Sequence, residues 1–289
     1  MVRRHERIPD DAQKQESVTD RHPPVMHSSE YGPPAPIPGP INTAGAEDSP
    51  FILPDGRTLY LFFTPDVSVP PEKQLLDGVS GIWVSNRVED QWTDPTRVWL
   101  QEPEKLALDG AVSIQGGEMW FASVREGYVG VNMFTADLVD GQWVNSRYAG
   151  DRLMFKIQIG EVHLHGDHLY FHSDRPGGKG GYDIWVTARE NGTWSDPVNI
   201  EPVNTESMDG FPFISADGRE MWFTRTYLGT PAVYRSMKED GEWTEPELIV
   251  SQYAGEPTLD AEGNLYFVHH YYEDSVMLES DIYVAYRKR

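Results

Sequence analysis

The sequence contains no cysteine, which excludes disulfide bonds, thiolate nucleophiles and zinc sites built on cysteine ligands. Basic residues are also scarce, because 24 Lys and Arg stand against 46 Asp and Glu and leave a formal net charge of −22. Nucleic acid and anionic lipid are both bound through clustered Lys and Arg, so neither partner is expected. Neutral or cationic partners are expected instead.

Long apolar runs are missing as well. No segment approaches the roughly 18 residues of a membrane-spanning helix, so membrane insertion is not expected. The first residues, MVRRHERIPDDAQKQESV, are basic in part but have no apolar stretch after them, so no signal peptide is visible. Aromatic residues, in contrast, make up 12% of the chain, which is too many for a disordered acidic protein.

A unit of about fifty residues recurs along the chain. Four tryptophans mark it, each directly after a polar turn: Trp92, Trp143, Trp194 and Trp243. A short alternating strand precedes each turn, and two further strands joined by a tight turn precede that strand. Asp-Gly and Asn-Gly pairs in the turns supply the positive φ that two-residue hairpins need. A fifth copy, DIYVAYR (281–287), ends the chain with no tryptophan after it.

Five copies of four antiparallel strands, without a convincing helix, predict an all-β fold, a five-bladed β-propeller. The strand missing from the last copy is found at the other end of the chain, because YGPPAPIPGPINT (31–43) matches WSDPVNIEPVNT (194–205). Tyr31 then stands where Trp194 stands. We therefore predict that an N-terminal strand is added to the last blade and closes the ring, which removes two free sheet edges.

The same match sets the expected domain limits. The propeller is predicted to span residues 31–289, with the regular tryptophans as packing residues between neighbouring blades. Residues 1–30 show no periodicity and are predicted to form a flexible tail that is free to dock a partner.

Two stretches of the third and fourth copies resemble the repeat of TolB-like propellers: SDRPGGKGGYDIWV (173–186) and DGFPFISADGREMWFTR (209–225). That repeat occurs in bacterial periplasmic and surface proteins, often beside peptidoglycan-binding domains. The resemblance implies the propeller fold and a periplasmic or extracellular location, although the sequence does not exclude the cytoplasm. TolB-like propellers usually have six blades, whereas five are countable here.

An acidic residue stands where each copy enters its first strand: Glu47 or Asp48, Asp109, Glu161, Asp209 and Glu256. First strands line the channel of a propeller, so these acids are expected at one mouth of the channel. One interpretation is structural, with the side chains capping backbone N–H groups in the turns between blades. A second is a cation site, Ca²⁺ above all, with Asp109 and Asp209 as the metal ligands. A third is a mouth that binds a carbohydrate or protein partner through Glu47, His163, Asp209 and Glu256.

The order of the acids is also similar to that in five-bladed glycosidases of the arabinanase and β-xylosidase type. These enzymes place a base Asp on the first blade, a pKa-tuning Asp on the second and an acid Glu on the third. The similarity implies Asp48, Asp109 and Glu161 as the catalytic residues of a glycoside hydrolase, which needs one protonated and one ionised carboxyl group. Glu47 competes with Asp48 for the first role because Glu47 aligns with Asp209.

Histidines gather in the third copy. His163 and His165 are two residues apart in a strand and share a face with Glu161, which is compatible with a zinc site or with a hydrogen-bonded or sugar-contacting histidine. His269 and His270 are neighbours in a strand, so at most one of them joins any site.

Two functions follow from these observations. The first is a non-catalytic, extracytoplasmic recognition or assembly module that binds a ligand at the acidic mouth. The alternative is a glycoside hydrolase that uses carboxylates at the same place. Carboxylates paired with arginine favour the module, whereas two carboxyl groups across an open pocket, one with a raised pKa, favour the hydrolase.

Overall fold

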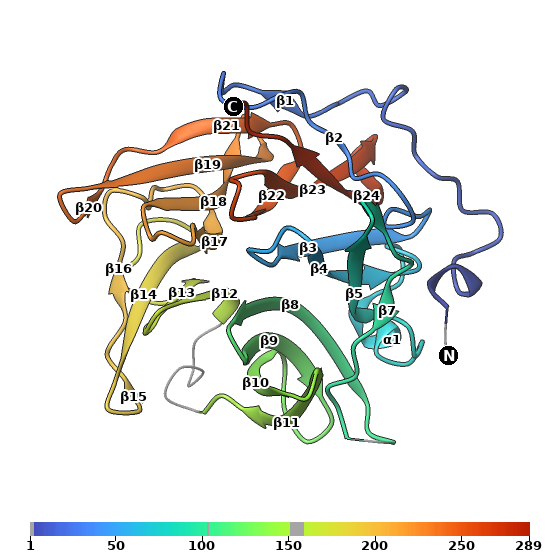
Figure 1. The fold of residues 1–289 in the computed structure, drawn as a ribbon, viewed down its shortest axis with the longest axis horizontal. Coiled ribbons are helices and arrows are strands. Elements are labelled where there is room, and N and C mark those ends of the chain that lie inside the picture. Colours follow the sequence, from blue (N-terminus) through green and yellow to red (C-terminus); the bar gives the residue numbers. More distant parts are fainter. Residues whose placement is uncertain (1–2, 103, 151–158) are drawn as a thin grey trace.

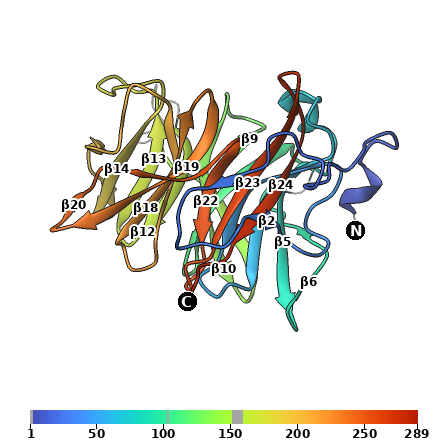
Figure 2. The same ribbon diagram turned by 90° about the horizontal axis from the view of Figure 1, so that it is seen from above.

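The computed structural model describes residues 3–102, 104–150 and 159–289 of the chain. In these residues five antiparallel sheets stand around one axis, as Figure 1 shows in a view down the shortest axis of the molecule and Figure 2 after a turn of 90°. The predicted five-bladed β-propeller is confirmed. No helix among the described residues is long and apolar enough to cross a membrane.

Each blade is built outward from the axis by three consecutive strands that pair antiparallel. The inner strands are β3 (Ala46–Ile52), β8 (Ala107–Gln115), β12 (Ile159–His165), β17 (Asp209–Ile214) and β22 (Ala254–Leu259). The second strands are β4 (Thr58–Thr64), β9 (Glu118–Arg125), β13 (His168–Ser173), β18 (Glu220–Tyr227) and β23 (Leu265–Glu273). The third strands are β5 (Gly81–Val88), β10 (Asn132–Val139), β14 (Asp183–Glu190), β19 (Thr230–Glu239) and β24 (Val276–Ala285).

The outermost position varies from blade to blade. Blade 2 has the single strand β11 (Gln142–Tyr148). In three blades this position is divided into two short strands. Blade 1 has β6 (Gln91–Trp92) and β7 (Thr96–Arg97), blade 3 has β15 (Thr193–Trp194) and β16 (Val198–Asn199), and blade 4 has β20 (Glu242–Trp243) and β21 (Glu247–Ser251). The N-terminal part supplies β1 (Val25–Met26) to blade 4 and β2 (Ala35–Pro36) to blade 5. Two short helices lie outside the sheets, the 3₁₀ turn η1 (Arg4–Glu6) and α1 (Pro71–Gln74).

The polar turns before the tryptophans are the hairpins that the sequence indicates. Asp140 and Gly141 have φ values of 50° and 77°. Both central residues of a type I′ turn need positive φ, and this turn type matches the twist of the two strands that it joins. The turn before Trp194 has the same form, with Asn191 at 50° and Gly192 at 76°.

The ring closes through the N-terminal strand, as predicted. In β2, Ala35 pairs with Val284 and Pro36 with Tyr283 of β24. The bond from the Ile37 N–H to the Ile282 carbonyl, 2.9 Å long, continues this pairing. Blades 5 and 1 are thereby joined by chain segments from opposite ends of the sequence.

The marker aromatic residues pack on the blade that precedes them. Trp194 meets Trp120 of blade 2 edge to face, with ring centroids 5.6 Å apart. Tyr31 meets Trp222 of blade 4 in the same way, at 5.9 Å and 89°. The Trp143 indole donates a hydrogen bond of 3.1 Å to the Tyr60 hydroxyl of blade 1. These contacts agree with the interpretation of the tryptophans as inter-blade packing residues.

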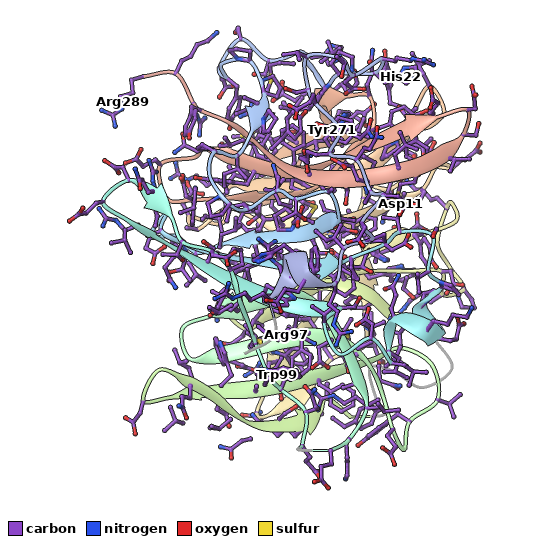
Figure 3. The ribbon with its side chains drawn as sticks, turned by 90° about the vertical axis from the view of Figure 1, so that its right-hand side faces the viewer. Asp11, His22, Arg97, Trp99, Tyr271 and Arg289 are labelled. Carbon is purple, nitrogen blue, oxygen red and sulfur yellow. The ribbon has the colours of Figure 1, made fainter. Side chains whose placement is uncertain are left out.

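The described part of the expected flexible tail, residues 3–30, lies against blades 1, 5 and 4. Arg4 pairs with Glu47 at 2.9 Å, and Lys14 lies 2.6 Å from the Asp281 carboxylate and also pairs with Glu279. Asp20 is 2.7 Å from the Nε2 atom of His269. Figure 3 shows Asp11 and His22 of this segment toward one face of the propeller and Arg289 toward the other. These contacts are not visible in the sequence, because they join residues 43 positions apart for Arg4 and Glu47 and about 250 or more for Lys14 and Asp20.

Lys14 provides a test of how firmly this segment is held. Glu279 and Asp281 are each 1% exposed, so Lys14→Met leaves two buried acids without their cation. We expect the change to lower the free energy of unfolding by about 3 kcal/mol, measured by chemical denaturation. Lys73→Met, at an exposed position of α1, is the matched control and is expected to have no effect. Equal stability of the two variants would contradict the structure in this region.

Candidate functional site: the channel mouth

A β-bulge near the start of each inner strand decides which acidic side chains face the channel. The register of pairing between inner and second strands shifts there in all five blades. In four blades the bulge residue has a left-handed φ: Ser49 (45°), Ala111 (47°), Phe211 (56°) and Glu256 (54°). An extra residue in one strand breaks the simple alternation of side chains. The acids that were aligned in the sequence therefore fall into two sets rather than one ring.

The first set lies before the bulge and is fully buried: Glu47, Asp109 and Asp209, each 0% exposed. Arg125 pairs with Asp109 at 3.1 Å, and Ser123 donates to the same carboxylate at 2.5 Å. Arg225 pairs with Asp209 at 2.5 Å. In blades 1, 2 and 4 a buried carboxylate is thus matched by a guanidinium.

Blade 1 takes its guanidinium from the N-terminal segment. Glu47 lies opposite Phe63 of β4 in the pairing, whereas Asp209 lies opposite Arg225 of β18. Phe63 offers no charge, and Arg4 fills the gap with its guanidinium 5.2 Å from the centroid of the Phe63 ring. Burial raises the pKa of Glu47 to about 7, and the charge of Arg4 opposes this shift. Sequence reasoning missed Arg4, since nothing in its local pattern marks it.

This placement favours the structural interpretation of the first set. Asp109 and Asp209, predicted as metal ligands, have no exposed surface and already carry an arginine each. The same burial applies to Glu47, predicted to bind ligand, and to Asp109 in its predicted catalytic role. The structure does not bring these side chains to the open mouth, and their assigned roles stay predictions.

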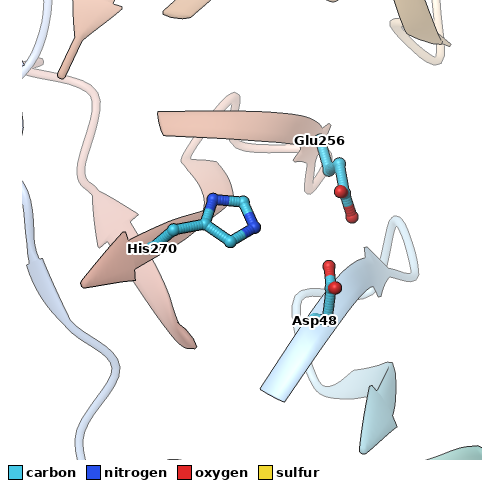
Figure 4. Close-up of side chains that lie close together, drawn as sticks. All are labelled: Asp48, Glu256 and His270. Atoms are coloured by element: carbon cyan, nitrogen blue, oxygen red, sulfur yellow. The ribbon is translucent and has the colours of Figure 1, made fainter. Parts of the chain in front are cut away.

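The second set is gathered at the mouth around the bulge of β3. The Ser49 N–H donates to Asp48 at 2.6 Å and to Glu256 at 2.9 Å, and the Ser49 hydroxyl donates to Glu161 at 3.0 Å. All three carboxylates are partly exposed. Figure 4 shows that His270 of β23 turns its imidazole toward Asp48 and Glu256. One ligand atom from each of Asp48, Glu256 and His270 lies within 4.8 Å of the other two.

The crowding of negative charge changes the proton affinity of this set. Burial, with the nearby charge of Asp48, raises the pKa of Glu161 to about 8. Burial and the charges of Asp48 and Glu161 raise the pKa of Glu256 well above its ordinary value. Burial lowers the pKa of His270, so its imidazole is neutral at pH 7 and has a ring nitrogen lone pair for a metal ion. Of the two adjacent histidines, one joins the mouth and the other, His269, pairs with Asp20, as their alternation predicted.

His163 lies deeper in the channel, away from the predicted ligand-binding position at the mouth. Its ring packs 4.5 Å from that of Phe213 and 6.0 Å from that of Phe51, and the two phenylalanine rings are 6.2 Å apart. We call these three rings the aromatic plug. Burial lowers the pKa of His163 to about 3, so the plug carries no charge. The space between the plug and the carboxylates is about 30 Å³, enough for one water molecule.

Comparison with known proteins places this geometry within a widespread fold. No family model matches the chain, and no curated protein matches its sequence. A Bacteroides ovatus protein described as "Xyloglucan PUL GH43B" is similar in structure, with 15% identity, a TM-score of 0.55, and coverage of 87% of this chain and 53% of its own. An α-L-arabinofuranosidase from Lactobacillus brevis shares 12% identity and a TM-score of 0.51, with 83% of this chain and 90% of its own covered.

TolB from Acinetobacter baumannii is a further structural relative, with 14% identity, a TM-score of 0.49, and coverage of 86% of this chain and 56% of its own. The chain thus spans about half the length of the TolB and GH43B structures. At these identities the likeness concerns the fold alone.

The raised pKa of Glu161 predicts how the stability of the fold depends on pH. A carboxyl whose pKa is raised by folding favours the folded state below its ordinary pKa of 4.5, and this contribution is lost as the pH rises to about 8. Glu161→Gln removes the titrating group. We therefore expect equal melting temperatures of wild type and variant near pH 4, and a higher melting temperature of the variant at pH 8.

The measurement is thermal unfolding across this pH range, with Glu72→Gln, at an exposed position, as the control. A constant difference between wild type and Glu161→Gln at all pH values would mean that the Glu161 carboxyl does not titrate as described.

Proposed function

We propose that this propeller is a non-catalytic binding module whose site is the channel mouth and whose primary ligand there is a divalent cation. The observation that carries the proposal is the convergence of Asp48, Glu256 and His270 within 4.8 Å, with Glu161 joined to them through Ser49. The buried acids of the first set each have an arginine, whereas no lysine or arginine of the described residues pairs with these three carboxylates. A cation would supply the missing positive charge.

The donor atoms indicate which cation fits. Two carboxylates and one neutral imidazole form a mixed oxygen and nitrogen set. Ca²⁺, the ion expected from the sequence, prefers six to eight oxygen ligands, whereas imidazole favours Zn²⁺ and other transition metals. Mn²⁺ and Zn²⁺ therefore fit this set better than Ca²⁺. Binding would displace the protons that crowding retains on Glu161 and Glu256, so affinity should rise with pH.

The biological ligand follows from the same chemistry. A cation held by three protein groups keeps open positions, which hydroxyl or carboxylate oxygens of a carbohydrate or protein partner would fill. An extracytoplasmic location, implied by the resemblance to TolB-like repeats, belongs to this proposal. A part for the N-terminal segment in partner binding also belongs to it, since this segment lies against blade 5, where the Lys14 ammonium is 5.4 Å from the centroid of the Tyr271 ring.

The test is a thermal-shift titration with Mn²⁺, Zn²⁺ and Ca²⁺ separately at pH 7.5. At a hundredfold excess over Kd a cation adds about 2.7 kcal/mol of stability, or roughly 5 °C for a chain of this size. We expect this shift with Mn²⁺ or Zn²⁺, a smaller one at pH 5, and none in Asp48→Asn combined with Glu256→Gln. Glu72→Gln is the control and keeps the full shift. No shift with any of the three ions, or an unchanged shift in the double variant, would refute the proposal.

A glycoside hydrolase is the second candidate, and one observation favours it. Glu161 holds its proton at neutral pH beside Asp48, which is the pairing of an acid with a nearby carboxylate that glycoside hydrolysis requires. Two observations oppose it. Asp109, the third expected member, is buried against Arg125, and the space beneath the carboxylates, about 30 Å³, has room for one water molecule but not for a sugar ring.

Turnover decides between the two candidates. Wild type and Glu161→Gln are assayed on arabinan, xylan and fructan by release of reducing ends. The hydrolase requires turnover by the wild type and a loss of at least a hundredfold in the variant, since general acid catalysis contributes about 10²–10⁴-fold. The binding module predicts no turnover by either protein, and hydrolysis that depends on Glu161 would overturn it.

A further inference from the structure

A second cavity opens at the other end of the channel. Its volume is about 440 Å³, and its walls come from the ends of the inner strands and the turns that follow them. The aromatic plug of Phe51, His163 and Phe213 lines this cavity on one side and the narrow space below the carboxylates on the other. The plug therefore separates this cavity, which we call the distal pocket, from the channel mouth.

The walls of the distal pocket are mainly apolar. The buried side chains of Ile114, Leu164 and Ile214, from three different blades, line it. With Phe51 and Phe213 of the plug they offer aliphatic edges and aromatic faces. A concave, largely apolar cavity of 300–1,000 Å³ with a few polar groups is the usual form of a small-molecule site.

The polar groups of the pocket select against negative charge. No lysine or arginine is among the described residues that line it. The Asp55 carboxylate at its rim already accepts bonds of 2.7 and 3.0 Å from the N–H groups of Arg57 and Thr58. The Gln115 amide is also used, because it both donates to and accepts from the backbone of Gly166. An anionic ligand would find no countercharge in these walls.

The imidazole of His165 remains as a polar group that is half-buried at the pocket wall. Burial lowers its pKa, as it does for His163, so both rings are neutral at pH 7. A neutral imidazole has one donor and one acceptor nitrogen and suits a ligand with a single hydrogen-bonding group.

We propose that the distal pocket binds one small, neutral molecule with a flat aromatic ring system, held between the Phe51 and Phe213 rings and the aliphatic walls. His165 orients it through one hydrogen bond. Aromatic rings packed on aromatic faces gain more than the burial of their area alone. This site is independent of the cation at the mouth, because the plug lies between them.

A pair of fluorescent probes tests both the place and the charge preference. N-phenyl-1-naphthylamine is a neutral compound, a naphthalene joined to a phenyl ring, that brightens in an apolar site. 8-Anilinonaphthalene-1-sulfonate is the same skeleton with an added negative charge. We expect saturable brightening of the neutral probe and at least tenfold weaker binding of the anionic one. Equal affinities, or no saturable brightening of the neutral probe, would overturn the assignment.

Two matched variants locate the binding. Ala216 is exposed in the turn after β17 and lines the pocket, so Ala216→Trp fills it without touching the core. Ala261 occupies the corresponding exposed turn position after β22 and does not line the pocket, so Ala261→Trp is the control.

We expect Ala216→Trp to weaken binding of the neutral probe at least tenfold and Ala261→Trp to leave it unchanged. If the melting temperature shows that Ala216→Trp disturbs the fold, Leu53→Trp in the pocket wall of blade 1 takes its place. Unchanged binding in the pocket-filling variant would show that the probe sits elsewhere and would refute the proposal.

Discussion

The pairing of a buried carboxylate with an arginine at the start of an inner strand is the interaction on which the channel depends. Glu47, Asp109 and Asp209 have no exposed surface, so each needs a positive partner to remain in place. Two of them receive it from the neighbouring strand of the same blade, and the third receives it from Arg4. Breaking such a pair costs far more than the pair contributes to stability, so the pairs fix geometry rather than add strength.

Because these pairs hold the first residues of the inner strands in place, the carboxylates at the mouth come close together. Thr43 and Thr205 each bond to the acid four residues later, at 2.7 and 2.8 Å, and so hold the link between one blade and the next. Asp48 lies on the face of β3 opposite to Glu47, and Glu256 lies in the bulge of β22, so both reach the mouth, where the Ser49 N–H bonds to each of them. The chain thus has two kinds of acidic residue. Those inside the blades are paired with arginine, whereas those at the mouth lie close together and pair with no arginine of the described residues.

The aromatic plug gives the two ends of the channel different chemistry. On one side carboxylates and an imidazole surround a space of water size, and on the other side apolar walls enclose a pocket of about 440 Å³. Three uncharged rings between them keep the polar groups of the mouth from reaching the pocket. One fold therefore offers a charged and an apolar site that share only the plug.

The sequence by itself determined the number of blades and the closure of the ring. A strand alternates its side chains and a hairpin needs its turn residues, so a repeat of strands and turns is visible without any tertiary contact. The match of residues 40–43 with 202–205 predicted the closure. In the structure the matched Asn42 and Asn204 make equivalent contacts, because each forms two hydrogen bonds with the backbone of the third strand of the preceding blade.

Only the tertiary structure decided which acids form the site. Glu47 and Asp48 are neighbours in the sequence, yet one is buried against Arg4 and the other lies at the mouth. Successive side chains of a strand point to opposite faces, and the bulge of β3 begins only after Asp48, so packing decides which of the two faces meets an arginine. Arg4 and His270 could not be assigned from their local pattern, since their partners lie 43 residues away in one case and on another blade in the other. Periodicity is a local property and survives in the sequence, whereas charge pairing across a closed ring is set by packing.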